Sequence, residues 1–168
     1  WKFFSKNLCK VTCPTQATYE YMLKKGIFEK NKLEVLYDPI INIKEIGSKK
    51  NEEINLEFLK NKKYILGIGR LTKQKNFSLL IKFFHKVQRD DLMLVILGIG
   101  EKKNELKKLV NQFNLNDKVH FLGQQNNVFK FLKNSECFVL TSLWEDPGFV
   151  IVEAGMSNTP IISSDCPN

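Results

Sequence analysis

The sequence predicts an α/β fold, in which a doubly wound parallel sheet is covered by helices on both faces. From residue 64 onward, short apolar runs alternate with segments whose apolar residues recur at helical spacing. The apolar runs are continuous rather than alternating, which is typical of strands buried on both faces of a parallel sheet. A chain that alternates strands and helices in this way builds a Rossmann-like domain.

Five buried strands are expected in this part of the chain, each followed by Gly or polar residues. They are expected at residues 64–68, 92–97, 119–122, 137–140 and 159–163. The first connecting helix is indicated by a stripe at helical spacing, formed by Phe77, Leu80, Ile81, Phe84 and Val87. Later helices are indicated by Leu106, Leu109, Val110 and Phe113, by Val128, Phe131 and Leu132, and by the segment from Gly148 to Met156.

Residues 1–45 do not follow this alternation. We expect a strand at residues 11–13, a helix that Thr15 caps and Gly26 ends, and a strand at residues 33–37. The polar and charged stretch that follows predicts a connector. The chain therefore divides into residues 1–40, a connector at 41–63, and a second domain at 64–168 that is incomplete at its C-terminus.

Composition excludes several classes of protein. A chain of 168 residues with 43% apolar and 26% charged residues is ordinary for a soluble globular protein. No apolar run approaches the roughly 18 residues of a membrane helix, and no signal peptide is evident. The four cysteines lack metal-type spacing, so we expect free thiols in a reduced cytoplasmic chain. Because the chain begins with Trp, we expect an excised fragment.

The net charge of +8 is unevenly distributed. Residues 1–75 contain 16 Lys and Arg against 8 acids, whereas the remaining residues contain 10 of each sign. This excess suits an anionic partner such as a phosphate group or an anionic membrane surface, although it also fits a Lys-rich, solvated surface. There is no RNA-binding motif and no interleaving of aromatic with basic residues, so no nucleic-acid partner is expected.

The loops after the strands hold the residues most suited to chemistry, because ligands of parallel sheets bind at the carboxyl ends of strands. Arg70, one of only two Arg, follows the first strand and offers a fork for phosphate oxygens. Lys75 adds a point charge just before a helix. Both could instead be solvated loop charges. Gly98-Ile99-Gly100 lacks the third Gly of a dinucleotide fingerprint and also fits a tight turn.

The segment from Trp144 to Ala154 is the most informative. Glu145 lies in a loop and Glu153 in a helix, with seven residues between them. Gly148 leaves helix N–H groups free to meet an anion, and Glu153 lies among apolar residues where an unpaired carboxylate is costly. Ribose hydroxyls would satisfy it. The alternatives are an ordinary loop acid and a partly exposed helix residue; nothing indicates two carboxylates facing across a glycosidase cleft.

These motifs together resemble glycosyltransferase family 4, whose members are retaining enzymes of the GT-B fold. The residues that carry the resemblance are Gly69-Arg70-Leu71, Lys75-Asn76, Gly98-x-Gly100, and the run 142–149 leading to Glu153-Ala154 and 160–164. The resemblance covers roughly Lys10 to Asn168, and Asp38-Pro39-Ile40 looks like a domain crossover. It implies that residues 1–40 end an acceptor domain and that residues 64–168 bind a nucleotide-sugar.

The resemblance also implies roles for individual residues. Arg70 and Lys75 would neutralise the donor pyrophosphate, Glu145 would contact the transferred sugar, and Glu153 would hold the ribose; the first three would be catalytic. The implied donor site is completed by Gly69, Gly98, Gly100, Gly123, Gln124, Val128, Gly148, Phe149 and Val150. Asn76 departs from the Gly of many members, and neither His85 nor His120 matches a catalytic His of the family.

The implied activity is metal-independent transfer, with retention, from a UDP-sugar to a glycan or lipid-pyrophosphate acceptor, without a cofactor. Such an enzyme builds a polysaccharide or lipopolysaccharide in the cytoplasm or at the inner face of the membrane. Two alternatives stay open. One is a non-catalytic nucleotide-binding module, which would need Glu153 but not Glu145, and the other is a sugar-nucleotide epimerase on the same fold.

Overall fold

The computed structural model describes residues 7–37, 43–145 and 148–166. The chain divides into two compact units, residues 1–41 and residues 42–167, and each is described by itself. The crossover expected at Asp38-Pro39-Ile40 lies outside the described residues, as do Asp146 and Pro147 of the second motif.

The smaller unit is a short β-α-β arrangement. Strand β1 (Val11–Cys13) pairs in parallel with β2 (Leu33–Val35), and α1 (Gln16–Lys24) connects them together with a 3-10 turn at Lys30–Lys32. The predicted cap is confirmed: Thr15 Oγ1 accepts a hydrogen bond from the backbone N–H of Thr18 at 3.0 Å. Gly26, with φ of +58°, follows the helix in the left-handed conformation that glycine adopts readily.

The larger unit is a parallel sheet of five strands in the order β5-β4-β3-β6-β7. Its strands are β3 (Lys63–Ile68), β4 (Leu92–Leu97), β5 (Val119–Gly123), β6 (Cys137–Leu140) and β7 (Ile161–Ser163). All five predicted strands are confirmed. Strand β7 begins later than expected because Thr159 belongs to the turn after the preceding helix, where its hydroxyl donates to the carbonyl of Leu132 at 2.8 Å.

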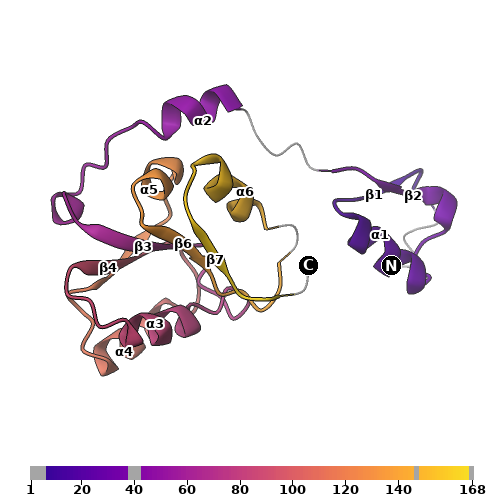
Figure 1. The fold of residues 1–168 in the computed structure, drawn as a ribbon. Coiled ribbons are helices and arrows are strands. Elements are labelled where there is room, and N and C mark those ends of the chain that lie inside the picture. The colour runs from indigo at the N-terminus through magenta and orange to yellow at the C-terminus, as the bar shows by residue number, and fades with distance from the viewer. Residues whose placement is uncertain (1–6, 38–42, 146–147, 167–168) are drawn as a thin grey trace. The chain divides into compact units, whose positions relative to one another are not determined.

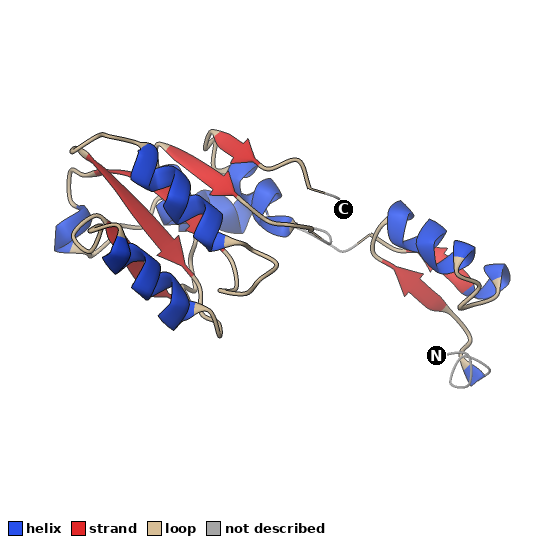
Figure 2. Ribbon diagram, turned by 90° about the horizontal axis from the view of Figure 1, so that it is seen from below, coloured by secondary structure: helices blue, strands red, loops and turns tan. Residues whose placement is uncertain are grey.

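Helices cover both faces of this sheet (Figures 1 and 2). Helices α3 (Phe77–Lys86) and α4 (Lys103–Gln112) lie on one face, and α5 (Phe129–Lys133) and α6 (Phe149–Met156) lie on the other. The strands alternate between two apolar cores accordingly. Leu94 and Ile96 pack toward α3 and α4, whereas Val95 and Leu97 pack toward α5 and α6. The predicted doubly wound fold is therefore present.

Of the connector predicted at residues 41–63, the described residues 43–62 pack as part of the larger unit. They include α2 (Ile43–Lys49) and a 3-10 turn at Glu57–Leu59. The side-chain amide of Asn127 donates to the carbonyl of Lys49 at 2.8 Å, and Lys133 Nζ donates to Asn51 Oδ1 at 2.6 Å. Leu59 joins the core beneath α5. The segment therefore covers the start of β3 rather than running free.

The strand order reverses between β3 and β6, the two neighbours at the centre of the sheet. The chain leaves β3 toward β4 on one side and leaves β6 toward β7 on the other. In sheets of this kind, ligands bind in the crevice outside the carboxyl ends of the strands at that reversal. The loops in this position are residues 69–76 and 141–148.

Candidate functional site

The two loops at the reversal point are tied to each other by backbone and side-chain hydrogen bonds. The N–H of Leu143 donates to the carbonyl of Gln74 at 2.8 Å. In return, the amide of Gln74 donates to the carbonyl of Trp144 at 3.0 Å. The hydroxyl of Thr141 donates to the carbonyl of Lys75 at 3.1 Å. These bonds fix the backbones from which the candidate site residues project.

A buried ion pair joins the same loops. Lys75 Nζ lies 2.6 Å from one carboxylate oxygen of Glu145 and 2.8 Å from the other. The Lys75 side chain is 13% exposed and that of Glu145 only 4%. The hydroxyl of Ser142 donates to the same carboxylate. The sequence selects Lys75 and Glu145 separately, and the structure brings them into contact; it also adds Ser142, which no motif chemistry singles out.

Two helices begin beside this ion pair, and neither has a side-chain cap. Helix α6 follows Gly148, whose φ of +71° is left-handed and whose backbone packs against the Glu145 side chain. Helix α3 follows Asn76, with φ of +48°. Asn is one of the few residues other than Gly that adopts this conformation, so it suits the position at which the resemblance leads us to expect Gly. The exposed Phe149 and buried Val150 open the first turn of α6, whose N–H groups suit an anion.

Arg70 and Glu153 have side chains without a hydrogen bond or ion pair to any described residue. Arg70 is exposed at the end of β3. Glu153 is half-buried in α6, and this burial raises the pKa of its carboxyl above the ordinary value. A half-buried carboxylate without a partner among the described residues loses hydration that none of them replaces. Both side chains are therefore free to receive a ligand.

Three of the candidate glycines have a packing role. A Cβ on Gly98, whose φ is +138°, would lie 1.9 Å from the carbonyl oxygen of Gly69. A Cβ on Gly100 would lie 2.5 Å from the carbonyl oxygen of Leu71. On Gly69, with φ of +152°, a Cβ would meet the Lys75 side chain at 3.1 Å. These glycines let the loops after β3 and β4 pass in backbone contact at the edge of the site.

The three residues expected around the base lie at the end of β5. Gly123 has a φ of +70° and open space where a Cβ would be. Gln124 is exposed, and Val128 is half-buried against the core beside α5. Among the imidazoles, the exposed His85 stacks on Phe113, and His120 packs against Phe58.

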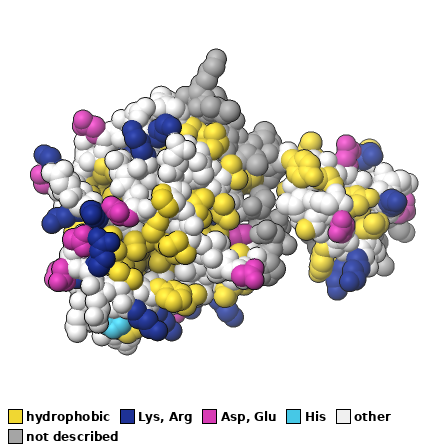
Figure 3. All heavy atoms as spheres, in the orientation of Figure 1, with side chains coloured by type: hydrophobic (Ala, Val, Ile, Leu, Met, Phe, Trp, Pro, Cys, Tyr) yellow, Lys and Arg dark blue, Asp and Glu magenta, His cyan; other side chains and the backbone are white. Residues whose placement is uncertain are grey.

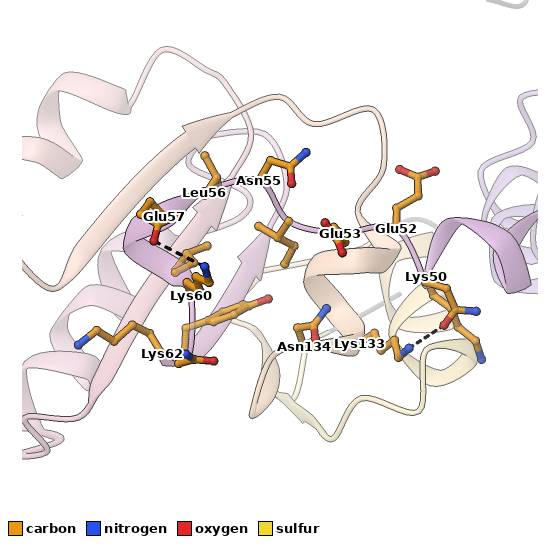
Figure 4. A pocket seen from close by; sticks show the side chains of 15 residues that line it. Lys50, Glu52, Glu53, Asn55, Leu56, Glu57, Lys60, Lys62, Lys133 and Asn134 are labelled. Carbon is orange, nitrogen blue, oxygen red and sulfur yellow. Dashed lines mark hydrogen bonds and ion pairs between the residues drawn. The ribbon is translucent and has the colours of Figure 1, made fainter.

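A wide depression of about 870 Å³ lies elsewhere, at the amino end of β3 (Figure 4). Its lining mixes lysines with acids, and Lys60 pairs with Glu57 at 3.9 Å. Lys133, which also lines the depression, donates a hydrogen bond to the side chain of Asn51. On the face in Figure 3, basic and acidic side chains are likewise interspersed over the larger unit. The loops at the carboxyl ends remain the better candidate site.

Within the described ranges, no group of three or more His, Cys, Asp or Glu is arranged to hold a metal ion. The four cysteines are free thiols, of which Cys13 is buried and Cys9 exposed. None of the helices in the described part of the chain has the length and apolar character needed to span a membrane.

Residues 48–168 match the family described as Glycosyl transferases group 1, and this range contains the whole sheet and both loops of the site. The chain belongs to the group 1 glycosyltransferases.

Relatives of this glycosyltransferase chain cover nearly its full length. It is 36% identical to an uncharacterized glycosyltransferase of Methanocaldococcus jannaschii, over 99% of the chain and 42% of that protein. It is 34% identical to a Campylobacter jejuni enzyme named as an N-acetylgalactosaminyltransferase acting on a diphospho-undecaprenol-linked sugar, over 90% of the chain and 40% of that protein. The chain spans about two fifths of the length of these relatives.

Solved structures support the fold assignment. Anabaena HepE in complex with UDP-glucose superposes with a TM-score of 0.78 at 19% identity, over 97% of this chain and 46% of that one. WaaG, a glycosyltransferase involved in lipopolysaccharide biosynthesis, superposes with a TM-score of 0.76 at 17% identity, over 94% of this chain and 45% of that one. The larger unit of the glycosyltransferase chain thus has the Rossmann-like architecture of GT-B enzymes.

Proposed function

We propose that this chain carries the donor site of a retaining family 4 glycosyltransferase, which transfers a sugar from a UDP-sugar to a glycan or lipid-linked acceptor. The observation that carries the proposal is the buried pair of Lys75 and Glu145, set at the reversal point of the sheet beside the uncapped start of α6. A site for a nucleotide-sugar needs cations for the diphosphate and a carboxylate for sugar hydroxyls, and both are present there.

The diphosphate would be held by three sources of positive charge. Arg70 is exposed and brings the planar fork that binds phosphate oxygens in pairs. Two of the three N–H donors of Lys75 serve Glu145, which leaves one for a phosphate oxygen. The first N–H groups of α6, at Phe149 and Val150, add the helix dipole. Stabilising the charge on the leaving diphosphate in this way is a large contribution to transfer, and it requires no metal ion.

The carboxylates of Glu153 and Glu145 would bind the ribose and the transferred sugar of the donor respectively. Glu153, which is half-buried and has no partner in the described chain, would accept hydrogen bonds from the ribose diol. Glu145 would accept hydroxyls of the transferred sugar. Glu145 also neutralises the buried ammonium of Lys75, a role that a nucleotide-binding module would share, so turnover is the measurement that separates a transferase from a binding module.

The acceptor proposal rests on the relatives. The Campylobacter jejuni enzyme is named for a diphospho-undecaprenol acceptor, and a Rhizobium meliloti relative, 35% identical over 60% of this chain and 29% of its own length, is named for lipopolysaccharide core biosynthesis. The basic excess in residues 1–75 would favour contact with such a lipid-linked pyrophosphate, or with the anionic inner face of the membrane. We therefore propose a cytoplasmic location, at or near that inner face.

Nucleotide binding tests the donor site. We expect UDP to raise the unfolding temperature of the chain more than GDP or ADP does, with a stabilisation of about 2.7 kcal/mol at one hundred times the dissociation constant. Arg70→Ala and Glu153→Ala should abolish this shift. The controls are Arg89→Ala, which removes the other Arg, and Glu136→Ala, at the amino end of β6 and so at the opposite end of the strands from the site. A chain that no nucleotide stabilises would contradict the proposal.

Turnover tests the remaining parts. With the intact enzyme and a UDP-sugar, we expect the product anomer to keep the configuration of the donor, as measured by nuclear magnetic resonance. Added EDTA should leave the rate unchanged. An inverted product, or a rate that EDTA abolishes and a divalent ion restores, would overturn the retaining or the metal-independent part respectively.

A further inference from the structure

Ser142 is a buried side chain of the site with no role in the proposed function so far. It is 2% exposed and lies two residues after the end of β6. Its hydroxyl donates to one carboxylate oxygen of Glu145, and its carbonyl accepts a hydrogen bond from the hydroxyl of Ser164 at 2.8 Å. We propose that Ser142 is a positioning residue that holds the Glu145 carboxylate ready for the transferred sugar. This inference rests on the proposed function.

The need for such a residue comes from the ion pair. Lys75 and Ser142 are the partners of the Glu145 carboxylate in the described chain. In the proposed donor complex, a diphosphate competes for the ammonium of Lys75. A phosphate bound to the third Lys75 proton weakens the ion pair, and a carboxylate that is 4% exposed then needs a further hydrogen bond, because a poorly compensated buried charge is costly. Ser142 provides that bond while the donor is loaded.

The geometry also leaves room for the sugar. A serine hydroxyl has a single proton to donate, and this proton goes to one oxygen of Glu145. Among the described residues, the other oxygen accepts from Lys75 alone, so one of its lone pairs remains for a sugar hydroxyl. Ser142 itself is fixed by the bond to Ser164 and by its neighbour Thr141, whose hydroxyl bonds the backbone of Lys75. The carboxylate is therefore held from a rigid base.

This role makes a prediction that loss of structure alone does not. Glu145 faces the sugar part of the donor, so Ser142→Ala should weaken binding of a UDP-sugar about tenfold, as expected for one hydrogen bond to a charged group. Binding of UDP should change less than about twofold by the same reasoning. Ser142→Thr keeps the hydroxyl and should therefore bind the UDP-sugar with nearly the affinity of the parent chain. The matched control is Ser135→Ala, which changes a half-buried serine just before the amino end of β6.

The experiment measures dissociation constants by isothermal titration calorimetry. The probes are UDP and the UDP conjugates of glucose, galactose, N-acetylglucosamine and N-acetylgalactosamine. Each variant is first shown to be folded by circular dichroism at the titration temperature. If Ser142→Ala does not fold, Ser142→Cys replaces it, since a thiol of similar size is a weaker donor and should give a smaller loss in the same direction.

A double-mutant cycle with Glu145→Gln decides whether Ser142 acts through Glu145. We expect Ser142→Ala to cause no further loss of UDP-sugar affinity in the Glu145→Gln background. An undiminished loss in that background, an equal loss for UDP and UDP-sugars, or no loss at all would each overturn the inference while leaving the donor site intact. A parent chain that binds neither UDP nor any conjugate would overturn the proposed function and this inference together.

Discussion

The ammonium of Lys75 lies within 2.8 Å of both carboxylate oxygens of Glu145, a residue 70 positions further along the chain. This contact links the loop after β3 to the loop after β6. In the proposed donor complex, it also links the group that binds the diphosphate to the group that binds the sugar. The ammonium and the carboxylate neutralise each other, and in the proposed complex each of them also contacts one part of the donor.

Glu145→Gln should destabilise the empty chain by about 3 kcal/mol, because it leaves a largely buried ammonium without its counter-ion. Urea unfolding measures this change. The control is Asp91→Asn, which breaks the exposed pair of Asp91 with Arg89 and should cost less than about 1 kcal/mol. A cost for Glu145→Gln as small as that of the control would mean that the pair contributes little to holding the two loops.

Glu153 should make stability depend on pH in an unusual direction. Burial raises its pKa in the folded chain, so the folded state binds this proton more tightly than the unfolded state does. Its contribution to stability is therefore unfavourable above the raised pKa, and this penalty disappears as pH falls below the ordinary carboxyl pKa. Without nucleotide, Glu153→Gln should stabilise the chain at pH 7.5 and have little effect on its stability at pH 3.5.

Thermal unfolding at both pH values measures the effect of Glu153→Gln. The control is Glu136→Gln, at an exposed position, where the parent and the variant should unfold alike. Saturating UDP should reverse the order at pH 7.5, because only the carboxylate accepts both ribose hydroxyls. A Glu153→Gln chain that is less stable than the parent without ligand would show that the carboxylate has a structural partner.

Much of the fold is predictable because its signals are local. Each buried strand is a short apolar run with a polar or Gly-bearing loop after it. The alternation of strands and helices therefore follows from the sequence, as does the placement of the ligand site at the carboxyl ends of the strands. The helix cap at Thr15 is also local. By contrast, residues 43–62 look like a polar connector, because their attachment depends on bonds from Asn127 and Lys133 that lie far along the chain.

The site shows the same limit. Lys75 and Glu145 can be selected individually by residue type and position, but their pairing depends on which two strands become neighbours. Ser142 opens the run 142–149 that carries the family resemblance, but its contact with Glu145 does not follow from the pattern, since a serine after a strand has many uses. In the sequence, Gly98 and Gly100 suggest a turn that binds a ligand. In the structure they allow close backbone contact with Gly69 and Leu71. A glycine pattern alone does not distinguish close contact with a ligand from close contact with another loop.

Asn76 should be replaceable by Gly but not by Ala. Its φ of +48° costs an ordinary L-residue roughly 1–2 kcal/mol, whereas glycine adopts it freely. We therefore expect Asn76→Ala to destabilise the chain by about 1 kcal/mol and Asn76→Gly to be close to neutral, as measured by urea unfolding. An Asn76→Ala chain as stable as the Gly variant would show that helix α3 starts equally well without the left-handed residue.

Gly98→Ala should be among the most damaging single-methyl additions in the larger unit. The new Cβ would lie 1.9 Å from the carbonyl oxygen of Gly69, a backbone atom that cannot move aside without displacing the loop after β3. We expect a cost above about 3 kcal/mol from this overlap. Two other glycines separate the possible causes. Gly123→Ala adds only the strain of a φ of +70° in open space and should cost about 1 kcal/mol.

Gly155→Ala, in α6 and without atoms near its Cβ, should stabilise the chain by up to about 1 kcal/mol. Urea unfolding of the three variants should therefore rank Gly98→Ala far below Gly123→Ala, and Gly155→Ala above the parent. If Gly98→Ala cost no more than Gly123→Ala, the close approach of the two loops would be wrong. Gly98 would then be free to contact a nucleotide, as the sequence pattern suggests.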